Sequence, residues 1–259
     1  MALPVLRVGL IGNGTVGSAF ATALDANQER LAQRLGARLR LTQVAVRHPD
    51  RHRGTLAGVR IHDDAESLAN DASVDLVVEA SGSPDAATWL RRAIARGAAA
   101  VSANKQAIAG DRVLLQALAD RHPLLHCEAA VAAALPIVRA LRDSLDGEEI
   151  HNVRGVLNGT TTYILTQIER GARFRDALLL AQEHGYAEAD AEADLSGRDA
   201  AAKLAILATL AWRRPITVHD VDTKGINGNI VDVVRVAREH GSRVRLVAEA
   251  WADDTLHLR

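Results

Sequence analysis

Short apolar runs alternate with segments of helical periodicity over the first 145 residues of the chain. Residues 5–11 (VLRVGLI) form a nearly continuous apolar run, which is typical of a strand buried on both faces of a parallel sheet. Apolar residues then recur at near-helical spacing from Val16 to about Leu35, and residues 39–46 (LRLTQVAV) predict a second strand. The beginning of the chain therefore predicts a strand-helix-strand unit.

The same alternation continues along the first half. Further strands are predicted at residues 74–81, 98–104 and 124–131, with helices around 84–96, around 110–121 and from Leu135 to about Leu145. Strands that alternate with helices pair in parallel through right-handed crossovers. We therefore expect a Rossmann-type α/β fold with a doubly wound parallel sheet.

The pattern changes near residue 148, where polar turn residues follow the last of these helices. A strand at 151–157 is followed by helices near 160–170, 174–184, 198–212 and 229–240, and then by two alternating strands, RVRLVAEAW and TLHLR. We predict two domains, over residues 1–148 and 149–259. The second is a smaller α+β domain suited to close over a ligand that the sheet holds.

Composition and charge favour small-molecule ligands. The 259 residues include 31 basic and 32 acidic side chains, so the net charge of −1 attracts neither nucleic acid nor an anionic membrane. The single cysteine, Cys127, excludes an intrachain disulfide, and no metal-type spacing surrounds it. We see no signal peptide and no apolar run near the ~18 residues of a membrane span, and expect a soluble cytoplasmic protein.

A glycine-rich turn follows the first predicted strand. Its G-x-G-x-x-G pattern gives a tight turn, a close approach of pyrophosphate to the backbone, and close packing of the helix on the strand. The helix N-terminus then faces the anion. Between a strand and a helix this pattern predicts a dinucleotide-binding domain, although a purely structural turn is the alternative. The expected cofactor contacts are Gly12, Asn13, Gly14, Thr15, Val16 and Gly17.

The end of the second predicted strand distinguishes NAD from NADP. NAD sites usually have an acidic residue there, about 20 residues after the turn, for the ribose diol. This chain reads VAVRHPDRHR, and Arg47 takes the place of the acid. A guanidinium suits the extra phosphate of NADP, so we predict NADP, with NAD or a solvated Arg47 as the alternative. Arg51 and Arg53 are expected to be solvated surface charges.

Acidic residues gather in the segment 185–207, ahead of a lysine on an otherwise apolar helix. Asp199 and Lys203 are four residues apart and share one helix face. Because the neighbouring positions are apolar, we expect Lys203 to be partly buried beside its carboxylate. The alternative is an ordinary helix pair that contributes about 0.2–0.5 kcal/mol.

Five segments resemble the homoserine dehydrogenase family, in order and at matching intervals. They are the glycine turn, SANKQAI (102–108), EAAVAAALPI (128–137), GVLNGTTTYIL (155–165) and GYAEADAEADLSGRDAAAKLAI (185–206). The last two are specific to the family, and the resemblance covers almost the whole chain. It implies NAD(P)-dependent hydride transfer between L-homoserine and L-aspartate 4-semialdehyde, in threonine and methionine biosynthesis. It also implies a homodimer formed through the sheet of the second domain, which binds the substrate.

The resemblance assigns roles to individual residues. Lys203 matches the catalytic lysine, and a lysine in a partly dry site supplies both a proton and positive potential to a developing alkoxide. Lys105 matches a second lysine at the nicotinamide end, with a surface lysine that caps a strand as its alternative. Acids suit the ammonium of a zwitterionic substrate. The expected substrate contacts are Glu188, Asp194, Asp199 and Thr160, of which Asp199 is also catalytic, and Ser81 is an expected cofactor contact.

Two further expectations concern the loops. Thr160 is expected to cap the helix that follows it. In the family a monovalent cation such as sodium is held by a glutamate and backbone carbonyls, which match Glu128, Val131, Ala133 and Leu135.

The chain also departs from the family pattern. Ala132, Ala133 and Ala134 replace usual glycines, so a backbone that needs positive φ would be disturbed there. Changes in EASGSPDAA (79–87) and at Thr162 leave open a reductase of a different amino-acid semialdehyde. The alanine substitutions and the early C-terminus leave open a cofactor-binding paralogue with impaired catalysis. The family usually continues for several dozen residues beyond LHLR, so we expect edge strands that another subunit covers, or a shortened paralogue.

Overall fold

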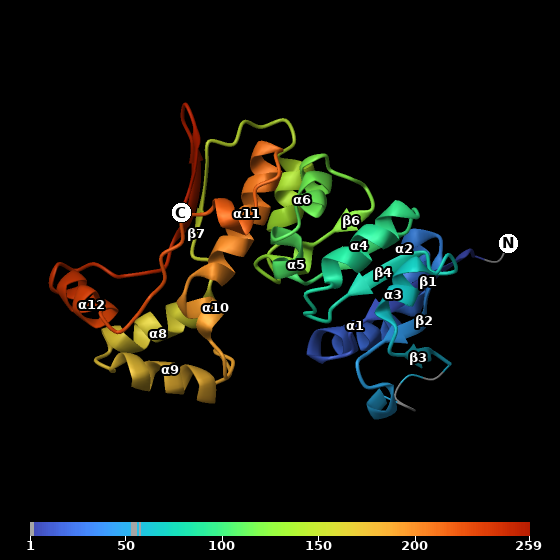
Figure 1. The fold of residues 1–259 in the computed structure, drawn as a ribbon, viewed down its shortest axis with the longest axis horizontal. Coiled ribbons are helices and arrows are strands. Elements are labelled where there is room, and N and C mark those ends of the chain that lie inside the picture. Colours follow the sequence, from blue (N-terminus) through green and yellow to red (C-terminus); the bar gives the residue numbers. More distant parts are fainter. Residues whose placement is uncertain (1–2, 53–55, 57) are drawn as a thin grey trace.

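The computed structural model describes residues 3–52, 56 and 58–259, and it divides into a parallel-sheet half and a helix-rich half (Figure 1). Arg53 lies outside the described residues. The sheet half is drawn in blue to green, and the helix-rich half extends from it in yellow to red.

Six parallel strands form the first sheet, in the order β3-β2-β1-β4-β5-β6. They are β1 (Val5–Ile11), β2 (Arg38–Ala45), β3 (Arg60–His62), β4 (Leu76–Glu79), β5 (Ala99–Ser102) and β6 (Leu125–His126). Val8, Leu10 and Val77 in the central strands are fully buried, as their continuous apolar runs predict. The predicted doubly wound sheet is confirmed, and its strand order changes direction between β1 and β4.

Helices cover the sheet. They are α1 (Thr15–Ala26), α2 (Gln28–Leu35), α3 (Ala65–Asn70), α4 (Ala86–Ala95), α5 (Lys105–Ala109), α6 (Arg112–Ala119) and α7 (Ile137–Arg139), with 3-10 turns η1 (Pro49–His52) and η2 (Glu128–Ala130) and the π-helical η3 (Ala140–Ser144). The single helix predicted from Val16 to Leu35 is wrong, because Asn27 breaks it and turns its side-chain amide back to the carbonyl of Ala23. The helix expected from Leu135 begins later and is partly π-helical.

The second half combines helices with a small antiparallel sheet, ordered β7-β8-β9. Its elements are β7 (Asn152–Gly155), α8 (Gly159–Glu169), α9 (Phe174–Glu183), α10 (Glu192–Leu195), α11 (Arg198–Trp212), η4 (Val218–Asp220), α12 (Ile230–Glu239), β8 (Ala248–Ala252) and β9 (Leu256–Leu258). The four predicted helices and the α+β character are confirmed. Strand β8 starts later than predicted, and α10 was missed because four residues are too few to show a period.

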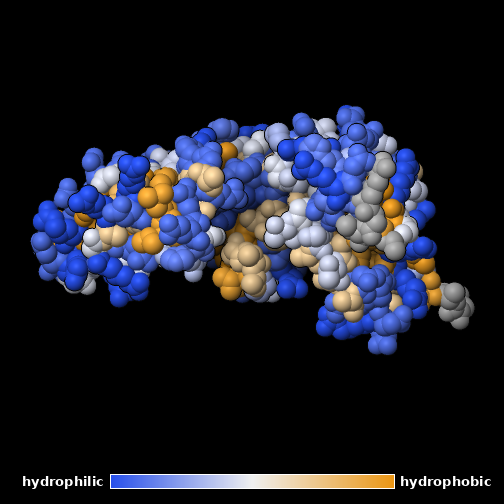
Figure 2. All heavy atoms as spheres, turned by 90° about the horizontal axis from the view of Figure 1, so that it is seen from below, coloured by the Kyte–Doolittle hydropathy of each residue, from blue (hydrophilic) through white to orange (hydrophobic). Residues whose placement is uncertain are grey.

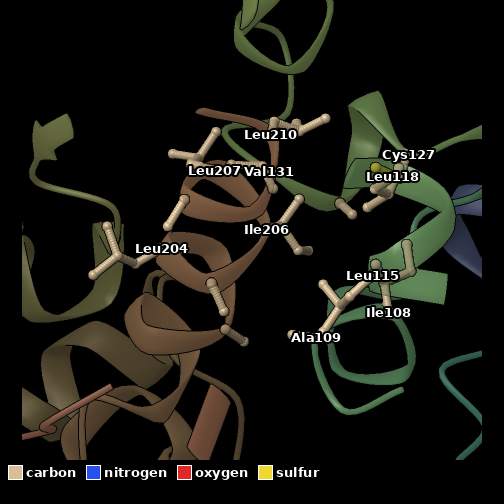
Figure 3. Close-up of a cluster of buried hydrophobic side chains, with 14 of the residues drawn as sticks. Ile108, Ala109, Leu115, Leu118, Cys127, Val131, Leu204, Ile206, Leu207 and Leu210 are labelled. Carbon is tan, nitrogen blue, oxygen red and sulfur yellow. The ribbon is translucent and has the colours of Figure 1, made fainter. Parts of the chain in front are cut away.

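Helix α11 joins the two halves through one hydrophobic core (Figure 3). Ile206 and Leu210 of α11 are buried against the side of the sheet half that carries Ile108 of α5 and Leu115 of α6. Burial of each such side chain stabilises the structure by about 1.5–3 kcal/mol. The beginning of α11 is therefore held in a definite place beside the beginning of α5.

A second tie between the halves uses charge. Asp146, in the polar segment near the predicted domain boundary, forms ion pairs with Arg121 after α6 and with Arg213 after α11. On the face shown in Figure 2, hydrophilic side chains cover most of the surface and apolar atoms form patches among them. Within the described ranges, no helix has both the length and the apolar character needed to cross a bilayer.

Candidate functional site

The glycine turn lies where β1 passes into α1, beside the loop that follows β4. Gly12 has φ +90°, and a Cβ placed there would lie 2.6 Å from the Cα of Ser81. A Cβ at Gly17 would collide with the carbonyl oxygen of Gly12. These two glycines therefore make a turn that a side chain would disrupt.

The N-terminus of α1 is left open for a ligand. Gly14 is its N-cap, no side chain caps the helix, and a Cβ at Gly14 would meet nothing within 4 Å. The first backbone N–H groups of Thr15, Val16 and Gly17 lack intrahelical partners, as in any helix. An anion placed there gains both these donors and the helix dipole, so the turn fits a pyrophosphate.

A cleft of about 1060 Å³ runs outward from this turn. One wall carries Arg47, which is exposed and lies two residues beyond β2, together with His48 and Arg51. Asp63 and Asp64 also line the cleft, so its charge is mixed. The side-chain amide of Asn13 lies 3.2 Å from Nδ1 of His52, which places Asn13 in the same wall.

A second cleft, of about 1140 Å³, lies between the two halves. Lys105 lines it from the sheet half, while Thr160, Glu188, Asp194 and Asp199 line it from the helix-rich half. The two clefts share Ala80, Ser83 and Thr88. Each is as large as the largest common ligand sites, about 1,000 Å³. An extended ligand therefore fits along the route from Arg47, past the glycine turn, to Asp199.

Asp199 lies between two lysine amines at the end of this route. Its Oδ1 is 2.9 Å from Nζ of Lys105, and its Oδ2 is 2.6 Å from Nζ of Lys203. Lys203 also donates a hydrogen bond of 2.7 Å to the carbonyl oxygen of Leu157. The side chain of Lys203 is 18% exposed, which confirms the predicted partly buried lysine beside its carboxylate.

The charge state of this cluster follows from its contacts. Burial acts to raise the pKa of the Asp199 carboxyl, but hydrogen bonds from Lys203, Lys105 and Asn158 outweigh burial and hold the pKa below its usual range. The carboxylate therefore stays ionised at neutral pH. The two lysine amines beside Asp199 place positive charge next to this carboxylate, which suits an oxyanion that develops there. The rest of the cleft wall is acidic, with Asp111, Glu188, Asp190 and Asp194.

Asn158 is a site residue that sequence reasoning missed. Its buried side-chain amide donates to Oδ1 of Asp194 at 2.6 Å and to Oδ2 of Asp199 at 3.0 Å. Its Oδ1 accepts the backbone N–H of Thr161 at 2.8 Å, so Asn158 also caps α8. An asparagine before the first residue of a predicted helix is a cap signal that could have indicated this.

The expected cap of α8 by Thr160 is therefore wrong. The Thr160 hydroxyl instead donates a hydrogen bond of 2.5 Å to the carbonyl oxygen of Tyr186. This bond ties the beginning of α8 to the acidic segment. Thr160 lies in the wall of the second cleft, but its hydroxyl proton is already committed.

The other predicted acids differ in their surroundings. Asp194 is half-buried and held by Asn158, whereas Glu188 is exposed at the rim of the same cleft. Within the part of the chain that the structure describes, the Glu188 carboxylate has no hydrogen bond or ion pair. Both carboxylates are therefore available to a cation in the cleft.

Ser81 lies under the turn rather than in open solvent. Its hydroxyl donates to Oε1 of Glu79 at 2.7 Å, and its N–H donates to the same oxygen at 2.8 Å. Ser81 lines the first cleft and so lies beside the predicted cofactor route. Its hydroxyl proton, however, already has Glu79 as its partner.

In the segment expected to hold a cation, Glu128 accepts hydrogen bonds from the start of the next helix. The Glu128 carboxylate accepts the backbone N–H groups of Val138 at 3.1 Å and Arg139 at 2.9 Å, and so caps α7. We expected the alanines here to disturb a backbone that needs positive φ. Instead, Ala132 and Ala133 adopt positive φ themselves, at 55° and 45°. Val131 is buried, and Leu135 is 65% exposed. In the described ranges, no group of three or more His, Cys, Asp or Glu side chains is arranged to hold a metal.

Comparison with protein-family models matches nearly the whole chain. The model of the homoserine dehydrogenase NAD binding domain matches residues 12–132, and the homoserine dehydrogenase model matches residues 136–259. Among curated proteins, the homoserine dehydrogenase of Helicobacter pylori is 38% identical over 247 residues, which cover 95% of this chain and 58% of that protein. The chain spans 50–58% of the length of such curated relatives.

Solved structures give the same family. A homoserine dehydrogenase from Thiobacillus denitrificans superposes with a TM-score of 0.87 and 34% identity, over 98% of this chain and 60% of that one. A protein from Archaeoglobus fulgidus, described as a candidate homoserine dehydrogenase, superposes with a TM-score of 0.84 and 31% identity, over 98% of this chain and 82% of that one.

Proposed function

Because the chain belongs to the homoserine dehydrogenase family, we propose that it catalyses reversible hydride transfer between L-homoserine and L-aspartate 4-semialdehyde with a nicotinamide cofactor. The observation that carries this proposal is the cluster of Lys105, Asp199 and Lys203. Lys105 and Asp199 line the second cleft, and Lys203 contacts Asp199 without itself being among the lining residues. The glycine turn lines the first cleft, which meets the second cleft at the residues that both share.

The turn and the open N-terminus of α1 would hold the pyrophosphate of the cofactor, with Gly12, Gly14 and Gly17 close to it. Ser81 and Lys105 would border the nicotinamide half, because they follow β4 and β5 at the carboxyl end of the sheet. When bound, the nicotinamide supplies or accepts the hydride.

Lys203 is the proposed proton donor in the reducing direction. Its amine is held by the Leu157 carbonyl and by Asp199, which leaves one N–H to point at the substrate oxygen. As the aldehyde carbon gains the hydride, the oxygen takes this proton and becomes the hydroxyl of the product. In the reverse direction Lys203 accepts the proton.

Asp199 and Lys105 act around this transfer. Asp199 keeps both amines in place through its two oxygens, and Lys105 adds positive potential where the oxyanion forms. The carboxylates of Glu188 and Asp194 would bind the substrate ammonium, and Asn158 orients Asp194 for this contact. Thr160 supports the same wall through Tyr186.

NADP is the proposed cofactor rather than NAD. Arg47 is exposed in the wall of the first cleft and occupies the position where an NAD site usually carries an acid. A guanidinium there would pair with the 2′-phosphate through two parallel hydrogen bonds. Asp63 and Asp64 line the same cleft, and their negative charges would repel the 2′-phosphate. Arg47 therefore favours NADP only if it lies closer to the ribose than these two acids do.

A homodimer through the small sheet is also proposed. In the described chain, β7 and β9 are the outer strands of β7-β8-β9, and each leaves one edge of backbone groups unpaired. A second copy would cover such an edge. A monovalent cation is a further proposal: the Glu128 carboxylate and the backbone carbonyls of Val131, Ala133 and Leu135 would hold it, and no step of the reaction is assigned to it.

An assay of cofactor oxidation tests the proposed reaction. The 259-residue chain is mixed with NADPH and L-aspartate 4-semialdehyde, and in reverse with NADP⁺ and L-homoserine. We expect turnover in both directions. Other amino-acid semialdehydes and amino alcohols serve as competitors. A higher kcat/KM for one of them would replace the proposed substrate, and binding of the cofactor without turnover of any substrate would refute the enzymatic proposal.

A further inference from the structure

Glu79 is a fully buried carboxylate that the proposed reaction does not yet use. It is the last residue of β4, with an exposed fraction of 0%, and it lies opposite Ile11 of β1 and Ser102 of β5. Strand β4 and strand β1 flank the point where the strand order reverses. Ligands of open α/β sheets bind just outside the strand ends at this point.

Hydrogen-bond donors surround both carboxyl oxygens of Glu79. Oε1 receives the N–H and the hydroxyl of Ser81, and Oε2 receives the hydroxyl of Ser102 at 2.6 Å. Each hydroxyl itself accepts a backbone N–H, from Ser83 at 3.1 Å and from Asn104 at 3.0 Å. Both hydroxyl protons are placed to point at the carboxyl oxygens of Glu79, an arrangement that suits an acceptor-only carboxylate.

Among the described residues, no lysine, arginine or histidine forms an ion pair with Glu79. The side-chain hydrogen bonds of Glu79 among the described residues all come from neutral donors. A buried carboxylate with only such partners carries an uncompensated negative potential into its surroundings.

The same bonds connect Glu79 to the proposed cofactor route. Ser81 and Ser83 belong to the loop after β4, which lines both clefts and packs against Gly12. Asn104 belongs to the loop after β5, donates to the carbonyl oxygen of Ser83 at 3.0 Å, and caps α5, whose first residue is Lys105. Glu79 thus lies directly behind the wall along which the nicotinamide half would extend.

We propose that Glu79 is a positioning residue for the nicotinamide half of the cofactor, and that its buried charge favours the oxidised, cationic ring over the reduced, neutral ring. This inference rests on the proposed binding of a nicotinamide cofactor. It does not depend on the choice between NAD and NADP, because the ring is the same in both. A fixed anion near a ring that changes charge affects one redox state and leaves the other nearly unaffected.

Equilibrium binding tests the inference without catalysis. Dissociation constants are measured by fluorescence titration for NADP⁺, NADPH, NAD⁺ and NADH, with the full chain and with Glu79→Gln. The readout is the Kd of the oxidised form divided by the Kd of the reduced form. We expect Glu79→Gln to raise this ratio about three- to tenfold, as loss of one charge at moderate distance predicts. A loss of loop order alone would weaken both forms together.

Matched variants separate charge from shape. Ser102→Ala removes one hydrogen bond and keeps the charge, and Glu79→Asp keeps the charge on a shorter side chain. Both are expected to leave the ratio within about twofold of the wild type. Glu79→Met serves as a second neutral variant, and circular dichroism verifies the fold of each. If neither neutral variant folds, the two charge-retaining variants still test the inference, because a shift of the ratio in either one contradicts it.

The outcomes distinguish this inference from the proposed function. A ratio unchanged in both neutral variants that still bind cofactor would overturn the role of Glu79 and leave the proposed reaction intact. If the wild-type chain turns over no substrate but the ratio of dissociation constants shifts as expected in Glu79→Gln, the proposed reaction is overturned and the role of Glu79 stands. A wild-type chain that binds none of the four nucleotides would overturn both.

Discussion

The amine of Lys105 lies 2.9 Å from Oδ1 of Asp199, and this contact joins the sheet half of the chain to the helix-rich half. Lys105 is the first residue of α5, and Asp199 lies in the first turn of α11. The two helices pack against each other further along through their buried apolar residues. The candidate site is therefore assembled at the point where two helices from different halves begin, and it requires both halves in place.

Lys203 is expected to be essential for turnover but not for cofactor binding. Lys203→Met keeps the aliphatic stem and removes the proton donor, so kcat should fall at least about 100-fold. The Kd of NADPH, measured by fluorescence, should change less than about twofold, because the glycine turn is untouched. Lys224→Met is the matched control, since Lys224 lines other surface pockets and should leave kcat unchanged. An unaltered kcat in Lys203→Met would remove this residue from the chemistry.

Asn158 is expected to act on both stability and substrate binding. Asn158→Ala removes the cap of α8 and the contacts with Asp194 and Asp199, so unfolding should require about 1–3 kcal/mol less free energy. The KM for homoserine should rise. Asn158→Ser keeps a good capping residue and loses the two carboxylate contacts. It should recover much of the stability in urea unfolding without recovering KM, whereas recovery of both would assign Asn158 to the helix cap alone.

The stability contributed by Asp199 should depend on pH in one direction. The pKa of Asp199 in the folded chain is lowered, so it lies below that of the unfolded chain, about 3.9. Its contribution is therefore fully present above the unfolded value and is lost as the pH falls toward the folded value. The difference in unfolding free energy between wild type and Asp199→Asn should be constant from about pH 8 to 5 and shrink below about pH 4. A difference that grows on acidification would contradict this sign.

Arg47 is expected to set the preference between the two cofactors. Arg47→Asp places an acid where the ribose diol of NAD would bind and removes the proposed phosphate contact. The ratio of kcat/KM for NADP to that for NAD should fall at least about tenfold, roughly the worth of one charge-assisted hydrogen bond. Arg51→Ala is the control in the same cleft, and should change the ratio much less. Equal effects of the two substitutions would show a general field rather than a specific contact.

Glycine should stabilise the chain at one unusual position. Ala133 has φ 45°, a left-handed conformation that costs an L-residue about 1–2 kcal/mol and that glycine adopts freely. Ala133→Gly relieves this strain, and part of the gain is offset by the greater freedom of glycine in the unfolded chain. We expect a net stabilisation of about 0.5–1 kcal/mol in urea unfolding. Ala23→Gly, at an exposed position inside α1, should instead destabilise by about 0.5–1 kcal/mol.

Periodicity in the sequence was sufficient for the long elements. The apolar runs of β1 and β2 and the helical spacing of α8, α9, α11 and α12 are local properties, and they predicted these elements close to their observed bounds. Two short elements, β3 and α3, were missed, because three and six residues do not show a clear period. The break at Asn27 was also missed, because apolar spacing continues across it.

The sequence by itself determined the sheet, the glycine turn, and the pairing of Asp199 with Lys203, because neighbours four residues apart on a helix meet whatever the rest of the chain does. Only the tertiary structure decided that Lys105 reaches Asp199 from 94 positions away, that Asn158 links two distant acids, and that Ser102 completes the burial of Glu79. Contacts between residues far apart in the chain depend on how whole helices and strands pack, and no local pattern records that packing.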